Sequence, residues 1–146
     1  MPNIETGSKL HRLALGGVQL TKFEDLCITK LVELVPVQIR KTLVEQLKLV
    51  SLVQREVGGR TLNFYATKFG RVNWKTAPMF KTNKDSAKLL KFDLRPEKNR
   101  LLHVNFWVVN GHFFQITFSE DVSSFSELDD FDIVGAKQSW RSEIIT

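Results

Sequence analysis

The segment 101–118 constrains the fold of this chain more than any other. Apolar residues are frequent on both sides of Asn110-Gly111, and the alternation over each arm is typical of a β-strand. An Asn-Gly pair favours a two-residue type I′ turn because both of its residues need positive φ. The sequence therefore predicts a β-hairpin of residues 101–109 and 112–118.

The predicted turn also sets a register for the hairpin, which starts with Val109 opposite His112. Counting outward, one face would hold the pairs Trp107 with Phe114, Asn105 with Ile116 and His103 with Phe118; the other would hold Val108 with Phe113, Phe106 with Gln115 and Val104 with Thr117. Both faces are then substantially apolar. One must pack on helices, and the second needs its own cover: a terminal segment, another subunit or a ligand.

Further strands are expected before this hairpin. Residues 60–67 and 88–95 have strand character, and Pro96–Asn99 has the composition of a turn. Lys68-Phe69-Gly70 is expected to be a turn from which residues 71–75 pair back, and residues 76–87 are expected to form a loop.

Two helices are predicted near the N-terminus. Thr21 and Glu24 fit a capping box, and apolar residues follow at helical spacing from Phe23 to Leu34. Pro36 ends that helix and can open a second one, predicted over residues 37–57 and stopped by Gly58-Gly59.

The C-terminal part is expected to add a short acidic helix, since Ser124 and Glu127 repeat the capping-box pattern. The tail, with Trp140, Ile144 and Ile145, is expected to fold back over the sheet. The whole prediction is one α+β domain over residues 1–146, in which two N-terminal helices pack on an antiparallel meander of four to five strands and a short C-terminal helix follows.

Composition narrows the class of protein. The chain is 42% hydrophobic and 25% charged, as folded proteins are, and most of its 11 Phe residues are expected in the core. Cys27, the single cysteine, is expected to be buried and inert. The start of the chain lacks signal-peptide features, and no stretch is long enough for a membrane span, so we expect a cytoplasmic protein with no membrane partner.

Charge is divided by position. Residues 60–100 carry eleven Lys or Arg residues and three acids, a balance of 11 − 3 = +8, whereas residues 119–132 carry six acids and no base. The net charge of +5 conceals this division, which predicts separate positive and negative surfaces.

The basic segment 68–91 interleaves cations with aromatic rings, a combination that can bind phosphates and stack on bases. The candidate partner-binding or nucleic-acid-binding residues are Arg71, Trp74, Lys75, Lys81, Lys84 and Lys88. The alternative is structural: Phe69, Trp74 and Phe80 would anchor the segment in the core while the cations stay in solvent.

Catalytic and metal-binding patterns are weak. His103 and His112 share a face of the predicted hairpin but lie about 20 Å apart at roughly 3.3 Å per residue, too far for one metal ion. No nucleophile motif occurs, and a carboxylate pair of Asp93 and Glu120 has no supporting signature. We therefore expect no catalytic residues, no metal and no cofactor, and an enzyme is left open as the less favoured class.

The sequence thus predicts a non-catalytic binding protein that engages a macromolecular partner, in the first place a protein, through charged patches and an apolar sheet face. The alternative is a nucleic-acid-binding module that uses segment 68–91. Association into a homo-oligomer also stays open.

Overall fold

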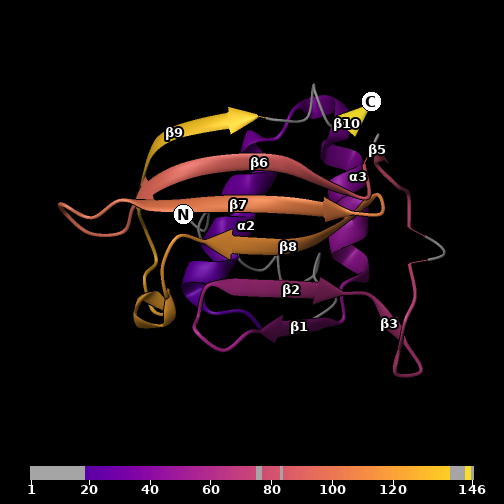
Figure 1. Cartoon of the computed structure of the whole chain (residues 1–146), viewed down its shortest axis with the longest axis horizontal. Helices are drawn as coiled ribbons and strands as arrows, with labels where there is room; N and C mark the ends of the chain where they lie inside the picture. Colours follow the sequence, from indigo (N-terminus) through magenta and orange to yellow (C-terminus); the bar gives the residue numbers. More distant parts are fainter. Residues whose placement is uncertain (1–18, 75–76, 83, 139–143, 146) are drawn as a thin grey trace, which may run out of the picture.

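The computed structural model describes residues 19–74, 77–82, 84–138 and 144–145. Helices α2 (Lys22–Leu34) and α3 (Val37–Leu49) lie on one face of a six-stranded antiparallel sheet (Figure 1). The strands, in spatial order, are β1 (Leu52–Arg55), β2 (Thr61–Tyr65), β8 (His112–Phe118), β7 (Leu102–Val109), β6 (Ser86–Arg95) and β9 (Asp132–Gln138). The α+β prediction is confirmed, but the sheet has six strands rather than four to five.

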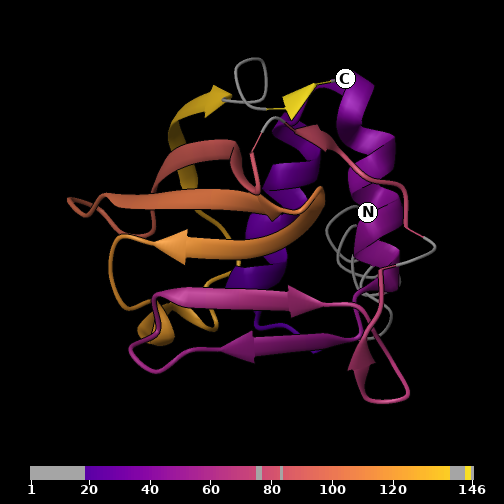
Figure 2. The ribbon, with the colours of Figure 1, turned by 45° about the vertical axis from the view of Figure 1, so that its right-hand side comes forward.

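Four short strands lie outside the main sheet. β3 (Thr67–Lys68) and β4 (Arg71–Val72) form a small hairpin, and β5 (Lys81–Thr82) pairs with β10 (Ile144–Ile145). Both pairs lie at the end of the sheet where β7 turns into β8 (Figure 2). Ile144 and Ile145 therefore pair with β5 instead of folding over the sheet, and Trp140 lies outside the described residues.

The start of α2 is as predicted. Thr21 Oγ1 accepts a hydrogen bond from the amide of Glu24 at 3.1 Å, and Glu24 Oε1 accepts one from the amide of Thr21 at 2.9 Å. This reciprocal capping box satisfies two amides that the helix cannot pair internally.

The second helix is shorter than predicted. It ends at Leu49, and residues 52–55 form β1. The β-branched residues Val50 and Val53 suit a strand, and the amide of Ser51 donates to the carbonyl of Tyr65 at 2.9 Å. Pairing with β2 therefore overrides the helical spacing, and Gly58-Gly59, both at positive φ, form the β1–β2 turn instead of a helix stop.

The central hairpin has the predicted turn but a different register. Val109 lies opposite His112 and Val108 opposite Phe113, as predicted, but Trp107 then pairs with Gln115. One extra residue on β8 makes a β-bulge at this point. Because side chains alternate between faces, the bulge puts Ile116 and Phe118 on the buried face with Phe113. The second face is therefore less apolar than predicted.

The predicted acidic helix is only a 3-10 turn, η1 (Ser123–Phe125). The ring centroids of Phe125 and Phe131 lie 5.9 and 5.8 Å from that of Phe23 on α2. Residues 128–130, which follow the turn, are not helical, and Asp129 and Asp130 are exposed. In a longer helix these two acids would lie near the C-terminus, where the helix dipole disfavours negative charge. The chain then continues into β9, a strand that the sequence did not indicate.

The core lies between the helices and the sheet and is rich in phenylalanine. Nine of the 11 Phe residues are buried, which confirms that expectation; Phe114 is half-buried and Phe69 is exposed. Cys27 is also fully buried, as expected.

Candidate functional site

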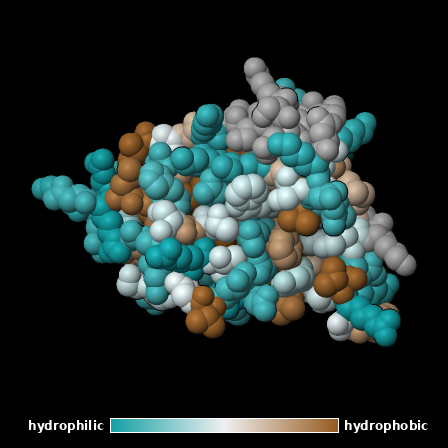
Figure 3. Space-filling view, viewed as in Figure 1, coloured by the Kyte–Doolittle hydropathy of each residue, from teal (hydrophilic) through white to brown (hydrophobic). Residues whose placement is uncertain are grey.

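The sheet face turned away from α2 and α3 is not covered by any described helix or strand; we call it the open face (Figure 1). Hydrophilic and intermediate residues occupy most of it, and hydrophobic residues occur in small groups (Figure 3). Three half-buried aromatic residues lie on it, Tyr65 on β2, Phe114 on β8 and Trp107 on β7.

In the half of the open face formed by β1, β2 and β8, the strand residues that point to this face carry no charge. The rings of Tyr65 and Phe114 meet edge to face, with centroids 5.2 Å apart. Gln115 Nε2 donates to Asn63 Oδ1 at 2.9 Å, and the Tyr65 hydroxyl donates to Gln54 Oε1 at 3.1 Å. These hydrogen bonds hold polar side chains and rings in fixed positions.

The half formed by β7, β6 and β9 carries cations. Lys88 Nζ lies 5.1 Å from the centre of the Trp107 ring, whose Nε1 donates to Thr117 Oγ1 at 3.0 Å. Lys91 on β6 lies directly opposite Lys137 on β9. Like charges in directly opposed positions destabilise a sheet, so this pair lowers the stability of the free protein.

His103 and Asp93 also lie on the open face. Their Nδ1 and Oδ1 atoms are 2.5 Å apart, and the His103 amide donates to Ser119 Oγ at 3.0 Å. The two carboxylates of the predicted Asp93 and Glu120 pair have different partners, since Glu120 forms an ion pair with Arg100 and Asp93 contacts His103. His103, Asp93 and Glu120 do not line either of the two cavities described below.

A groove of about 650 Å³ lies beside the β7–β8 turn. Two of the predicted site residues, Lys81 and Lys84, line it together with Met79, Phe80, Thr82, Asp85, Asn110 and Gly111. The other predicted residues lie elsewhere: Arg71 is exposed on β4, and Lys88 lies on the open face.

Trp74 is not a free ring. It stacks on His112 with centroids 4.8 Å apart and an interplanar angle of 13°, and it packs against the core. Trp74 is half-buried and Phe80 is buried, whereas Phe69 is exposed. The structural alternative thus holds for two of the three rings of segment 68–91. Lys75 lies outside the described residues.

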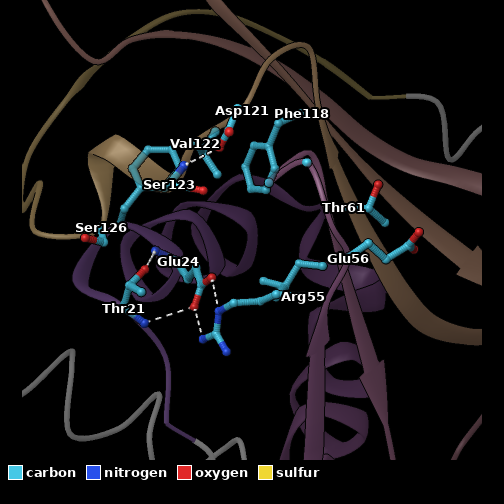
Figure 4. A pocket seen from close by; sticks show the side chains of 14 residues that line it. Thr21, Glu24, Arg55, Glu56, Thr61, Phe118, Asp121, Val122, Ser123 and Ser126 are labelled. Atoms are coloured by element: carbon cyan, nitrogen blue, oxygen red, sulfur yellow. Dashed lines mark hydrogen bonds and ion pairs between the residues drawn. The ribbon is translucent and has the colours of Figure 1, made fainter.

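A second cavity of about 350 Å³ lies between the start of α2, the β1–β2 turn and the loop after β8 (Figure 4). The Glu24 carboxylate points into it and is bound by Arg55 Nε at 2.8 Å and by the Thr21 amide. Hydrogen bonds from the Ser123 side chain and amide lower the pKa of Asp121. Both carboxylates are engaged in structural hydrogen bonds, which leaves them poorly placed for proton transfer to a ligand.

Other reactive groups are dispersed. Burial, with a smaller contribution from the Glu24 charge, raises the pKa of the Cys27 thiol well above its usual value. In the part of the chain that the structure describes, no three His, Cys, Asp or Glu side chains converge as a metal site. No helix within the described ranges is long and apolar enough to cross a membrane.

The prediction that Trp107 and Phe114 share one face of the hairpin is confirmed, but the sequence did not place Tyr65 beside Phe114 or Lys91 opposite Lys137. The alternation of buried and half-buried residues on β8 breaks between Phe114 and Gln115, at the bulge, and no local signal in the sequence marks this point. Lys137 lies in a segment that was not recognised as a strand.

Comparisons of this chain with protein-family models, with curated protein sequences and with solved structures found no match.

Proposed function

We propose that the protein is a non-catalytic binding protein whose partner is a single-stranded nucleic acid. The observation that carries the proposal is the cross-strand pairing of cations, Lys91 with Lys137 on the open face and Lys68 with Arg71 on the β3–β4 hairpin. Each pair costs stability in the free protein. A bound polyanion would turn that repulsion into attraction.

The wider charge distribution supports an anionic partner. Cations gather at or toward one end of the sheet, and they come from segments 67–72, 81–91 and 136–138 (Figure 1). These three segments hold one acid, Asp85. The described cations of this basic surface are Lys68, Arg71, Lys81, Lys84, Lys88, Lys91 and Lys137. The acidic segment 119–132 leaves β8 at the opposite end.

Aromatic rings among these cations favour a single strand over a duplex. Bases of a single strand are free to stack on side-chain rings, and such binding tolerates many sequences. Trp107 lies beside Lys88, and Lys88 and Lys91 follow one another along the same strand. The bulge on β8 makes the second face less apolar than the sequence predicted, which weakens the main argument for placing a protein partner first.

Fluorescence anisotropy with a labelled single-stranded oligonucleotide, at low and at physiological salt, tests the proposal. We expect saturable binding whose affinity falls steeply as salt is added. Lys91→Gln with Lys137→Gln should lower the salt-dependence slope by roughly 1.4, at about 0.7 for each lost phosphate contact on a single strand.

The matched control is Lys22→Gln with Lys41→Gln, which removes the same charge from exposed positions on the two helices. It should leave the slope near that of the unmodified protein. Absence of binding at low salt, or equal effects of the two double variants, would contradict the proposal.

A protein partner is the second candidate, and the uncharged half of the open face favours it. Leu52 is 49% exposed and lies opposite Tyr65, which contacts Phe114. Aromatic residues are enriched in protein interfaces. A purified partner that binds the unmodified protein, loses binding on Phe114→Ala and ignores Lys91→Gln with Lys137→Gln would put this candidate first.

A further inference from the structure

The β3–β4 hairpin projects beyond the end of the sheet, and its tip is the two-residue turn Phe69-Gly70 (Figures 1 and 2). Both residues have positive φ, 53° for Phe69 and 75° for Gly70. These signs of φ are those of a type I′ turn.

Phenylalanine is a poor choice for this backbone. A second turn with these signs of φ, between β7 and β8, has φ of 50° at Asn110 and 82° at Gly111, and it uses the favoured Asn-Gly pair. A bulky residue with positive φ is disfavoured because its Cβ crowds the backbone. The chain therefore holds Phe at a position where Asn would be more stable.

Burial of the Phe69 ring does not offset the unfavourable backbone conformation. Nine of the other ten Phe residues are buried, whereas Phe69 is 93% exposed. Its neighbours add a second cost, since Lys68 and Arg71 are exposed and lie directly opposite each other. Lys68 Nζ lies 5.8 Å from the centre of the Phe69 ring.

We propose that Phe69 is a stacking residue for a nucleic acid base, with Lys68 and Arg71 binding the adjacent phosphates. The inference rests on the proposed function and names a specific contact for it. One exposed ring between two cations matches a base between two phosphates. A protein partner fits less well, because stable protein interfaces bury about 800 Å² on each side, and within residues 67–72 Val72 is the only other large apolar side chain that is exposed.

The test compares Phe69→Asn and Phe69→Tyr in the full chain, with the labelled single-stranded oligonucleotide as probe. Phe69→Asn should weaken binding at least about fivefold, the lower end of the loss expected when one stacked ring is removed. Its thermal midpoint should be unchanged or higher, since Asn suits positive φ. Phe69→Tyr keeps a ring and should bind within about twofold of the unmodified protein.

The salt dependence separates stacking from charge. Stacking is not ionic, so Phe69→Asn should lower affinity without changing the salt slope, whereas Lys68→Gln with Arg71→Gln should lower the slope. Equal binding by Phe69→Asn and the unmodified protein would overturn the inference. The inference would also be overturned if Phe69→Tyr lost as much affinity for the oligonucleotide as Phe69→Asn does.

The outcome also distinguishes this inference from the proposed function. If the unmodified protein binds and Lys91 and Lys137 are required, but Phe69→Asn has no effect, only the stacking role fails. If the unmodified protein does not bind the oligonucleotide, both fail. A purified protein partner that needs Phe69 while the oligonucleotide does not would also refute the stacking role.

Discussion

At the scale of single residues, Gln46 links α3 to the central hairpin. Its buried side chain donates to the carbonyls of Pro78 and Gly111, at 2.7 and 3.0 Å, and accepts from the Phe113 amide at 2.8 Å. The bulge on β8 begins just after Phe113, so Gln46 supplies a partner to an amide at the point where strand pairing is interrupted.

Gln46→Leu should therefore lower the free energy of unfolding by about 2 to 3 kcal/mol, because it leaves the buried Phe113 amide without its hydrogen bond. Gln38→Leu is the matched control, an exposed glutamine on the same helix, and should change stability by less than about 0.5 kcal/mol. Urea unfolding measures both, and equal effects would show that the buried amide is not required.

His112 makes stability depend on pH. Burial lowers its pKa in the folded protein, so the unfolded chain takes up the proton first as the pH falls. The stabilisation is thus present above the unfolded pKa of about 6.5 and is lost as the pH falls below it.

We expect His112→Phe, which keeps a ring against Trp74 but cannot titrate, to lose less stability than the unmodified protein between about pH 7 and about pH 5. Denaturant unfolding of the two proteins at about pH 7 and about pH 5 measures the two losses of stability. Parallel losses in the two proteins would mean that His112 does not contribute to the pH dependence.

At the scale of elements, the β3–β4 turn and the β7–β8 turn differ in what surrounds their glycines. A Cβ on Gly111 would lie 2.9 Å from the Phe80 carbonyl oxygen and from Met79 Cε, whereas a Cβ on Gly70 would meet nothing within 4 Å. Both glycines have positive φ.

Gly70→Ala should therefore cost about 1 kcal/mol from backbone strain alone, and Gly111→Ala should cost about 2 kcal/mol more because the segment before β5 must move. Thermal unfolding of the two variants checks the order. A larger effect at Gly70 would contradict the packing of segment 77–80 on the β7–β8 turn.

The edge strand β9 carries one member of the Lys91–Lys137 pair. Lys137→Glu would replace the repulsion across the strands with an attraction and should raise the free energy of unfolding by about 0.5 kcal/mol. The same substitution should weaken oligonucleotide binding. If Lys137→Glu were less stable than the unmodified protein and bound the oligonucleotide equally well, the Lys91–Lys137 pair would neither lower stability nor contribute to binding.

At the scale of the whole molecule, the basic surface and the acidic segment 119–132 lie at opposite ends of the strands. Charges separated by more than the Debye length, about 8 Å at physiological salt, are largely screened from each other. The two ends should therefore act independently on an anionic ligand.

Asp129→Asn with Asp130→Asn should accordingly change oligonucleotide affinity by less than about threefold at physiological salt. Lys81→Gln with Lys84→Gln, at the basic end, should weaken it and reduce the salt slope. A larger effect from the aspartate pair would show that the acidic segment competes directly with the ligand.

Local features of this protein could be predicted from its residues. The Thr21 capping box depends on residues three positions apart, and the Asn110-Gly111 turn depends on the φ preferences of two neighbours. The core positions of phenylalanine follow from its lack of a polar group. Each of these depends on interactions within a few residues or on one side chain's transfer free energy.

Tertiary contacts decided the rest. The sequence by itself predicted two helices, an antiparallel sheet and a basic segment with aromatic rings. Only the folded chain ended α3 at Leu49 for pairing with β2, placed the bulge that moved Ile116 and Phe118 inward, stacked Trp74 on His112 and left Phe69 exposed. These outcomes depend on partners distant in sequence, whose contact energies exceed the local preferences of about 1 kcal/mol per residue.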